Sequence, residues 1–221
     1  MILWDIMKCS IGIYPNQRFE NCRTAITKMY RDIAEIIGIE DYDIVNPYNN
    51  KLTKSYDLLI ISKGYRERVE KLNPYPIFEI KSATFDNLIN SMNELKKLNI
   101  GVSNLRSKFY DCKNFPKENF EDFTKINNYI ENINKKKNQI KSIKYNKDIK
   151  INTKSEFIKK IIIDLGLTLS NDGITVIPDY MVNKGDINDG IIIINTHNYD
   201  LNTLERIENR YLQIINSINS L

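Results

Sequence analysis

The sequence predicts an α/β fold, with a mainly parallel central sheet flanked by helices and a helical excursion in the middle of the chain. Short β-branched, apolar runs alternate with longer segments whose apolar residues recur three and four positions apart. Strands separated by helices form parallel sheets, because each crossover returns the chain to the same edge. The run Ile191 to Ile194 has no polar alternation, which predicts a strand covered on both faces, inside a sheet. With 221 residues and 42% hydrophobic content, the chain is long enough to bury a core.

The first part of the chain is expected to alternate strands and helices. The expected helix 16–37 follows from one apolar face that includes Phe19, Cys22 and Ile26, and Gly38 ends it. Thr84 is expected to cap a helix at 85–98. A shorter helix is expected at 65–72, and strands are expected at 2–7, 42–45, 57–61, 76–80 and 100–103.

The middle and last parts differ in character from the first. After an irregular stretch, a helix at 117–137 is expected to run into a lysine-rich connector, interpreted as solvated, with phosphate binding as the alternative. Three parts result: 1–103, 104–150 and 151–221. The pattern leaves open whether the first and last parts share one sheet. In the last part, helices are expected at 155–165 and 201–218, with strands at 174–177 and 190–195.

Composition and spacing argue against several classes of function. The net charge of +4 is a mild excess that does not indicate nucleic acid, although 13 tyrosines keep an RNA-binding or assembly module open as an alternative. The glycines form neither a dinucleotide fingerprint nor a P-loop. One histidine and three cysteines without C-x-x-C spacing predict no metal site held by this chain alone. The apolar runs are too short for a membrane span, and the expected location is cytoplasmic, with free thiols.

Cys9 is the candidate catalytic residue. It lies where the apolar run 2–7 gives way to a polar turn and then to the expected helix. Ligands of open α/β sheets bind beyond the carboxyl ends of the strands, where helix N-termini offer unpaired N–H groups. Those groups and Lys8 would stabilise a thiolate, the nucleophilic form of cysteine. The alternative is a half-buried structural cysteine. Cys22 is expected in the core and Cys112 at the surface.

The segment Met7-Lys8-Cys9-Ser10-Ile11-Gly12-Ile13, followed by alternating short strands and helices, resembles the HcgF family of [Fe]-hydrogenase cofactor biosynthesis in methanogens. The resemblance implies that Cys9 takes up the carboxyl group of guanylylpyridinol as a thioester, by acyl transfer from an acyl adenylate made by the partner protein HcgE. It implies no cofactor of the protein's own. Guanylylpyridinol would be the ligand or substrate, and a homodimer is compatible with this interpretation.

The remaining candidate ligand-binding residues follow four expected strands. Carboxyl ends of parallel strands meet at one edge of a sheet, and small hydroxyl and basic side chains suit phosphate and polar ring substituents. The alternative is that these residues are ordinary helix caps. A competing function is that of a nucleotide-binding or nucleotide-hydrolysing protein in which Cys9 is structural. The candidates are Lys8, Ser10, Ser62, Lys63, Gly64, Ser82, Thr84, Thr196 and His197.

Overall fold

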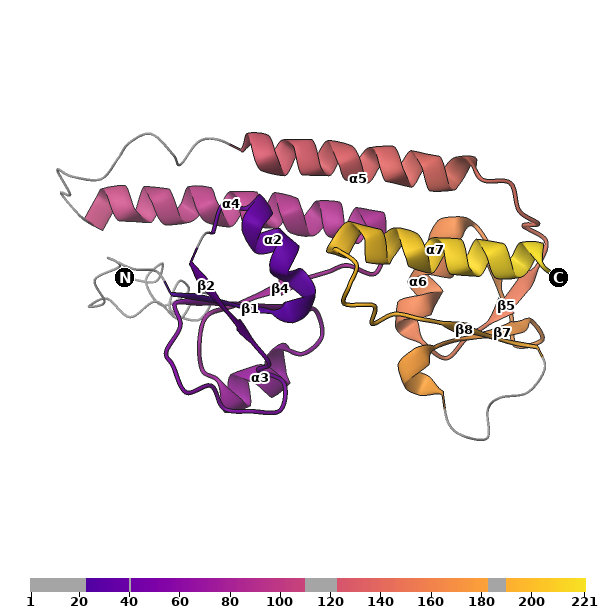
Figure 1. Cartoon of the computed structure of the whole chain (residues 1–221), viewed down its shortest axis with the longest axis horizontal. Coiled ribbons are helices and arrows are strands. Elements are labelled where there is room, and N and C mark those ends of the chain that lie inside the picture. Colours follow the sequence, from indigo (N-terminus) through magenta and orange to yellow (C-terminus); the bar gives the residue numbers. More distant parts are fainter. Residues whose placement is uncertain (1–22, 40, 110–122, 183–189) are drawn as a thin grey trace, which may run out of the picture. The chain divides into compact units, whose positions relative to one another are not determined.

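The computed structural model describes residues 23–39, 41–109, 123–182 and 190–221 (Figure 1). The chain divides into two compact units, Met1–Lys81 and Ser82–Leu221. Each unit has its own four-stranded sheet, and every strand pairing in both sheets is parallel. The predicted α/β class with parallel sheets is therefore confirmed. The question left open by the sequence is also answered, because the first and last parts contribute to separate sheets.

The sheet of the first unit has the strand order β2-β1-β3-β4. Helices α2 and α3 lie on opposite sides of it (Figure 1). The strands are β1 (Thr24–Thr27), β2 (Tyr42–Val45), β3 (Leu58–Ser62) and β4 (Ile77–Ile80), and the helices are the 3₁₀ turn η1 (Lys28–Tyr30), α2 (Arg31–Ile36) and α3 (Arg66–Leu72).

The two central strands of this sheet are buried on both faces. β1 pairs with β3 in the register Ala25↔Leu59 and Ile26↔Ile60, and all four residues are fully buried. Ala25 and Leu59 form a core cluster with Val69 of α3. Because side chains alternate along a strand, Ile26 and Ile60 face the opposite side. The continuous apolar character of β3 is what a parallel strand with both faces covered requires.

The predicted helix 16–37 is wrong over residues 24–27, which form β1. The helical spacing of the apolar residues was real, but Thr24 and Thr27 are β-branched and all four residues are buried. Pairing with β2 and β3 on both sides therefore outweighs the local pattern. The helix proper begins only at Arg31. The expected strand 2–7 lies outside the described residues.

The second unit contains the sheet β6-β5-β7-β8 and the longer helices. Its strands are β5 (Lys150–Asn152), β6 (Thr168–Leu169), β7 (Ile174–Pro178) and β8 (Ile191–Ile194). Its helices are α4 (Phe85–Phe109), α5 (Thr124–Ser142), α6 (Glu156–Leu165), the 3₁₀ turn η2 (Asp179–Met181) and α7 (Thr203–Asn219).

Helices α6 and α7 confirm the helices predicted at 155–165 and 201–218, with boundaries that differ by at most two residues. Ser155 accepts a hydrogen bond from the Ile158 N–H at the start of α6, and Asn202 with Glu205 forms a capping box for α7. Gly166 ends α6 at φ 74°, a left-handed conformation that glycine adopts without steric cost. The buried isoleucines of α6 and α7 recur at helical spacing, so the local pattern and the packing agree.

Three expectations in the second unit are corrected. Residues 100–103 continue α4, since a helix satisfies its backbone locally whereas a strand needs a partner. β8 is an edge strand, and Ile193 is 43% exposed, so its run of isoleucines is not covered on both faces. The lysine run is not simply solvated, because Lys136 pairs with Glu208 and Lys137 with Asp86. None of the described helices is long and apolar enough to cross a membrane.

Candidate functional site

The carboxyl ends of the parallel strands are the positions at which α/β sheets bind ligands. Cys9, Lys8 and Ser10 lie outside the described residues, as do Cys22 and Cys112. The other candidate residues divide between the two units. Ser62, Lys63 and Gly64 belong to the first unit, and Ser82, Thr84, Thr196 and His197 belong to the second. The two sheet edges therefore belong to separate units.

In the first unit, the loop after β3 uses its polar groups internally. Lys63 Nζ lies 2.8 Å from Glu79 Oε2, and the Gly64 N–H donates to Glu79 Oε1 at 2.8 Å. Gly64 has φ +96°, which favours glycine. The Ser62 hydroxyl lies 3.2 Å from the Tyr30 hydroxyl. These contacts give Lys63 and Gly64 a structural role in holding the loop on β4.

Glu79 is the centre of this arrangement, with only 8% of its side chain exposed. Burial by itself would raise its pKa, but hydrogen bonds from Lys63 and the Gly64 N–H, with the nearby Arg66, outweigh burial and lower the pKa. The carboxylate is therefore ionised at neutral pH and clamps the loop by charge-assisted hydrogen bonds.

We expect Glu79→Gln to lower the free energy of unfolding by about 1–3 kcal/mol at neutral pH. Because the pKa is depressed in the folded state, the contribution is present above the unfolded value of about 4.3 and is lost as the pH falls through the folded value. Urea unfolding at a series of pH values measures this difference, which should shrink in acid. A difference between the two proteins that stays constant with pH would contradict the assignment.

In the second unit, Asp179, Thr196 and His197 form a hydrogen-bonded chain at the carboxyl ends of β7 and β8. The Thr196 hydroxyl donates to Asp179 Oδ1 at 2.5 Å, and the Thr196 N–H donates to the same oxygen at 3.1 Å. The Thr196 hydroxyl oxygen also lies 2.9 Å from His197 Nδ1. Parallel pairing of Pro178 with Ile194 brings these residues together, since Asp179 directly follows β7, and Thr196 and His197 follow β8 after Asn195.

The direction of this chain determines the histidine tautomer. Burial would raise the pKa of Asp179, but the two hydrogen bonds from Thr196 and the nearby His197 lower it, so the carboxylate is ionised and can only accept. The single hydroxyl proton of Thr196 therefore goes to Asp179. The hydroxyl oxygen then accepts from His197 Nδ1, an arrangement in which the Nε2–lone-pair tautomer is the one that a neutral imidazole adopts.

Two exposed tyrosines flank the His197 ring. The ring centroid of Tyr180 lies 5.4 Å away at an interplanar angle of 76°, and that of Tyr199 lies 6.0 Å away. Tyr180 is 57% and Tyr199 48% exposed, and 42% of the His197 side chain is exposed. The edge thus presents two accessible tyrosine rings beside an oriented imidazole, a surface suited to stacking and hydrogen bonding.

Arg210 of α7 connects two of the predicted loops. It is 3% exposed, and its guanidinium donates to the carbonyl oxygens of Ser82 and Thr196, both at 3.0 Å. Its guanidinium carbon lies 4.9 Å from the centroid of the Phe157 ring, a cation–π contact. The structure therefore brings the Ser82 loop and the Thr196 loop together. Thr84 instead caps α4 by accepting from the Asn87 N–H.

Sequence reasoning missed Asp179, Tyr180 and Arg210. Asp179 and Tyr180 could have been found, because they follow the strand 174–177 just as Thr196 and His197 follow theirs. Arg210 offered no such signal, since an arginine in an amphipathic helix is ordinarily solvated. Its burial depends on Ser82, which lies 128 positions earlier in the sequence.

The donor set at this edge does not form a multidentate metal site. His197 Nδ1 lies 3.5 Å from Asp179 Oδ1. Within the part of the chain that the structure describes, no three histidine, cysteine, aspartate or glutamate side chains gather as metal ligands. Metal sites in proteins ordinarily use three or four such ligands.

Comparison with known sequences gives a family match along most of the chain. Residues 25–137 match the model of the MJ0786 family N-terminal domain, and residues 147–221 match that of the MJ0786 family C-terminal domain. The protein "Uncharacterized protein MJ0786" of Methanocaldococcus jannaschii is 51% identical over 197 residues, which cover 89% of this chain and 94% of that protein.

Several solved structures have a similar fold. The SBP FpvC from Pseudomonas aeruginosa, in complex with Mn²⁺, matches with a TM-score of 0.60 and 8% identity, covering 91% of this chain and 99% of that one. A Zn(II)-bound mutant variant of AdcAII of Streptococcus pneumoniae matches with a TM-score of 0.59 and 11% identity, covering 90% and 100%. ZnuA matches with a TM-score of 0.55 and 10% identity, covering 89% and 99%. At these identities the likeness establishes the fold.

Proposed function

The chain belongs to the MJ0786 family, and we propose that it is a binding protein for a small, ring-containing ligand held at the carboxyl edge of the sheet in its second unit. The observation that carries the proposal is the oriented His197 ring between Tyr180 and Tyr199. The Asp179–Thr196–His197 chain holds the Nε2 lone pair available to accept a hydrogen bond from the ligand, while the exposed tyrosine rings provide stacking surfaces.

The fold likeness supports ligand binding but not a metal site like those named for the fold neighbours. FpvC is described with Mn²⁺ and AdcAII with Zn(II). This chain has one histidine, and its described residues bring together only His197 and Asp179 as a pair of strong donors. Such a pair does not fit a multidentate metal centre.

The finer form of the proposal names guanylylpyridinol as the ligand and Cys9 as the nucleophile. The assignment of Cys9 is supported by the resemblance of residues 7–13 to the HcgF family. The assignment of the ligand is supported by the exposed aromatic side chains of the second unit, which suit a ligand made of two ring systems. An acyl adenylate of the pyridinol, supplied by HcgE, would lose AMP as the Cys9 thiolate attacks its carbonyl carbon. The competing class is a nucleotide-binding protein with a structural Cys9.

The stacking contact can be tested with guanylylpyridinol as the probe. We expect Tyr180→Ala to weaken binding by about tenfold. Removing an aromatic side chain on which a base-sized ring stacks costs roughly 1–3 kcal/mol of binding free energy. Tyr180→Phe should bind normally, since it keeps the ring and loses only the hydroxyl. His197→Ala should weaken binding by a similar factor through loss of Nε2. Isothermal titration calorimetry measures all three affinities.

Unchanged affinity in both Tyr180→Ala and His197→Ala would overturn the placement of the ligand at this edge. If wild type binds guanylylpyridinol and the two variants do not, the placement is supported. Failure of wild type to bind guanylylpyridinol would overturn the finer proposal, and a titration with GMP would then test the competing nucleotide-binding class. Tyr180 is more than half exposed, and 42% of the His197 side chain is exposed, so neither alanine substitution should disturb the fold.

A further inference from the structure

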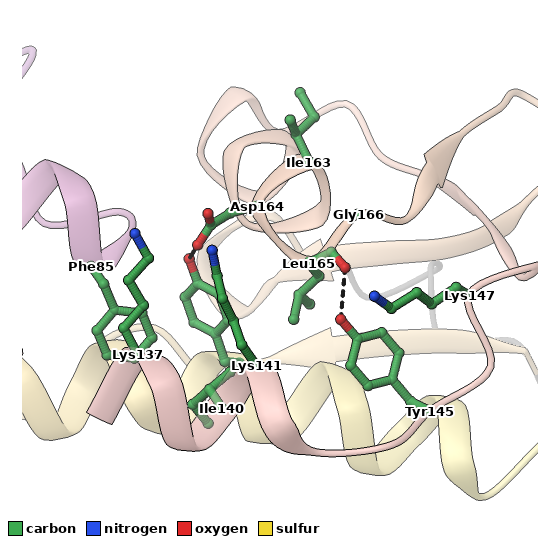
Figure 2. A pocket seen from close by; sticks show the side chains of 11 residues that line it. Phe85, Lys137, Ile140, Lys141, Tyr145, Lys147, Ile163, Asp164, Leu165 and Gly166 are labelled. Atoms are coloured by element: carbon green, nitrogen blue, oxygen red, sulfur yellow. Dashed lines mark hydrogen bonds between the residues drawn. The ribbon is translucent and has the colours of Figure 1, made fainter. Parts of the chain in front are cut away.

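A concave site lies in the same unit, away from the His197 edge. It is a cavity of about 360 Å³ between α5, the segment that follows it, and the C-terminal end of α6. This volume lies within the range of small-molecule pockets. The side chains of Lys137 and Lys141 rise from α5 in the same direction, and that of Lys147 points toward Leu165 (Figure 2).

The lining of the cavity is cationic at its rim. Lys137, Lys141 and Lys147 face one lining carboxylate, Asp164, which accepts a hydrogen bond from the Tyr211 hydroxyl at 2.5 Å. Lys137 is paired with Asp86. Among the described residues, no carboxylate lies within 4.0 Å of the ammonium of Lys141 or Lys147. These two charges are therefore available to an anion.

The inner part of the cavity is aromatic and apolar. Phe85, Ile140 and Tyr211 contribute to the lining, and each is at most 2% exposed. Tyr145 is held in place because its hydroxyl donates to the Leu165 carbonyl oxygen at 2.6 Å. Burial raises the pKa of this tyrosine, so its hydroxyl stays protonated and continues to donate. An anion at the rim would therefore have a ring-sized apolar surface beneath it.

The structure assigns a second ligand site to this cavity, and we propose that it binds a small phosphate-bearing molecule that carries a ring. The phosphate lies at the ammonium groups of Lys141 and Lys147, and the ring packs on the apolar lining. The helix C-terminus at Gly166 accounts for one nearby cation. It does not account for both Lys141 and Lys147, which border the cavity without a carboxylate within 4.0 Å of either ammonium among the described residues.

Phenyl phosphate is the probe, because it joins both features in one molecule. We expect saturable binding by calorimetry that is tighter than the binding of inorganic phosphate or phenol. The double variant Lys141→Gln/Lys147→Gln should weaken it by at least about tenfold, a loss that charge-assisted hydrogen bonds can account for. Binding should also fall as salt is added.

The matched control is Lys135→Gln/Lys144→Gln, which removes the same charge from lysines that do not line the cavity. It should bind phenyl phosphate within about twofold of wild type. Equal weakening by the control would show a general charge effect and overturn the site. Unchanged affinity in the Lys141/Lys147 variant, no saturable binding by wild type, or equal affinity for inorganic phosphate would each overturn the proposal as stated.

Discussion

Cys9→Ser should abolish the formation of a hydroxylamine-labile adduct when the protein is incubated with adenylated guanylylpyridinol. The thiolate is the nucleophile that converts an acyl adenylate into a thioester, and a serine hydroxyl of similar size is a far weaker nucleophile at neutral pH. Intact mass spectrometry before and after hydroxylamine measures the adduct, because the amine cleaves a thioester and leaves an amide intact. Reversible binding of guanylylpyridinol should persist in the variant.

The other two cysteines serve as matched controls for this experiment. Cys22→Ser and Cys112→Ser should still form the labile adduct, since the sequence places neither at a strand end. If Cys9→Ser retains the adduct, the thioester lies on another residue. If wild type forms no adduct although it binds the ligand, the protein is a binding protein without acyl transfer at Cys9.

Arg210→Ala should lower the free energy of unfolding of the second unit by about 3–5 kcal/mol, the largest stability effect we expect. The guanidinium is buried and donates to the carbonyl oxygens of Ser82 and Thr196. Alanine would leave both acceptors without this donor and would open a cavity beside Phe157. Urea unfolding followed by circular dichroism measures the loss.

A control in the same unit separates burial from charge. Lys159→Ala removes an exposed ion pair with Glu156, whose side chain is 79% exposed, and should change stability by less than about 0.5 kcal/mol. Arg210→Lys keeps the charge but not the planar fork, and should fall between alanine and wild type. A loss below about 1 kcal/mol in Arg210→Ala would show that the two carbonyl groups find other donors.

Much of the architecture could be read from local patterns. The strand 42–45 and the helix at 155–165 were predicted because each depends on neighbouring residues in the chain. β5 and β6 were not predicted, since they have three and two residues and no apolar run. They are strands because β5 pairs with both β6 and β7. This pairing is a property of the sheet and not of the local sequence.

The candidate site follows the same division. The sequence predicted Thr196 and His197 as ligand residues, and the structure places both at a carboxyl edge. The sequence could not predict the orientation of the His197 ring, because this depends on Asp179. Asp179 lies 17 positions before Thr196 and is brought near it by the parallel pairing of β7 with β8. The lysine run was predicted as a solvated connector, with phosphate binding as the alternative. The sequence did not predict the cavity that Lys141 and Lys147 border.

Local spacing, capping and turn chemistry decided most of the helices and strands, because the free energy of forming these elements depends on residues within a few positions. Tertiary structure alone decided that residues 24–27 become a central strand, that Arg210 is buried between two loops, and that Lys141 and Lys147 border a cavity. In each case, the contact that changes the free energy lies far away in the sequence, so burial and pairing outweigh the local preference.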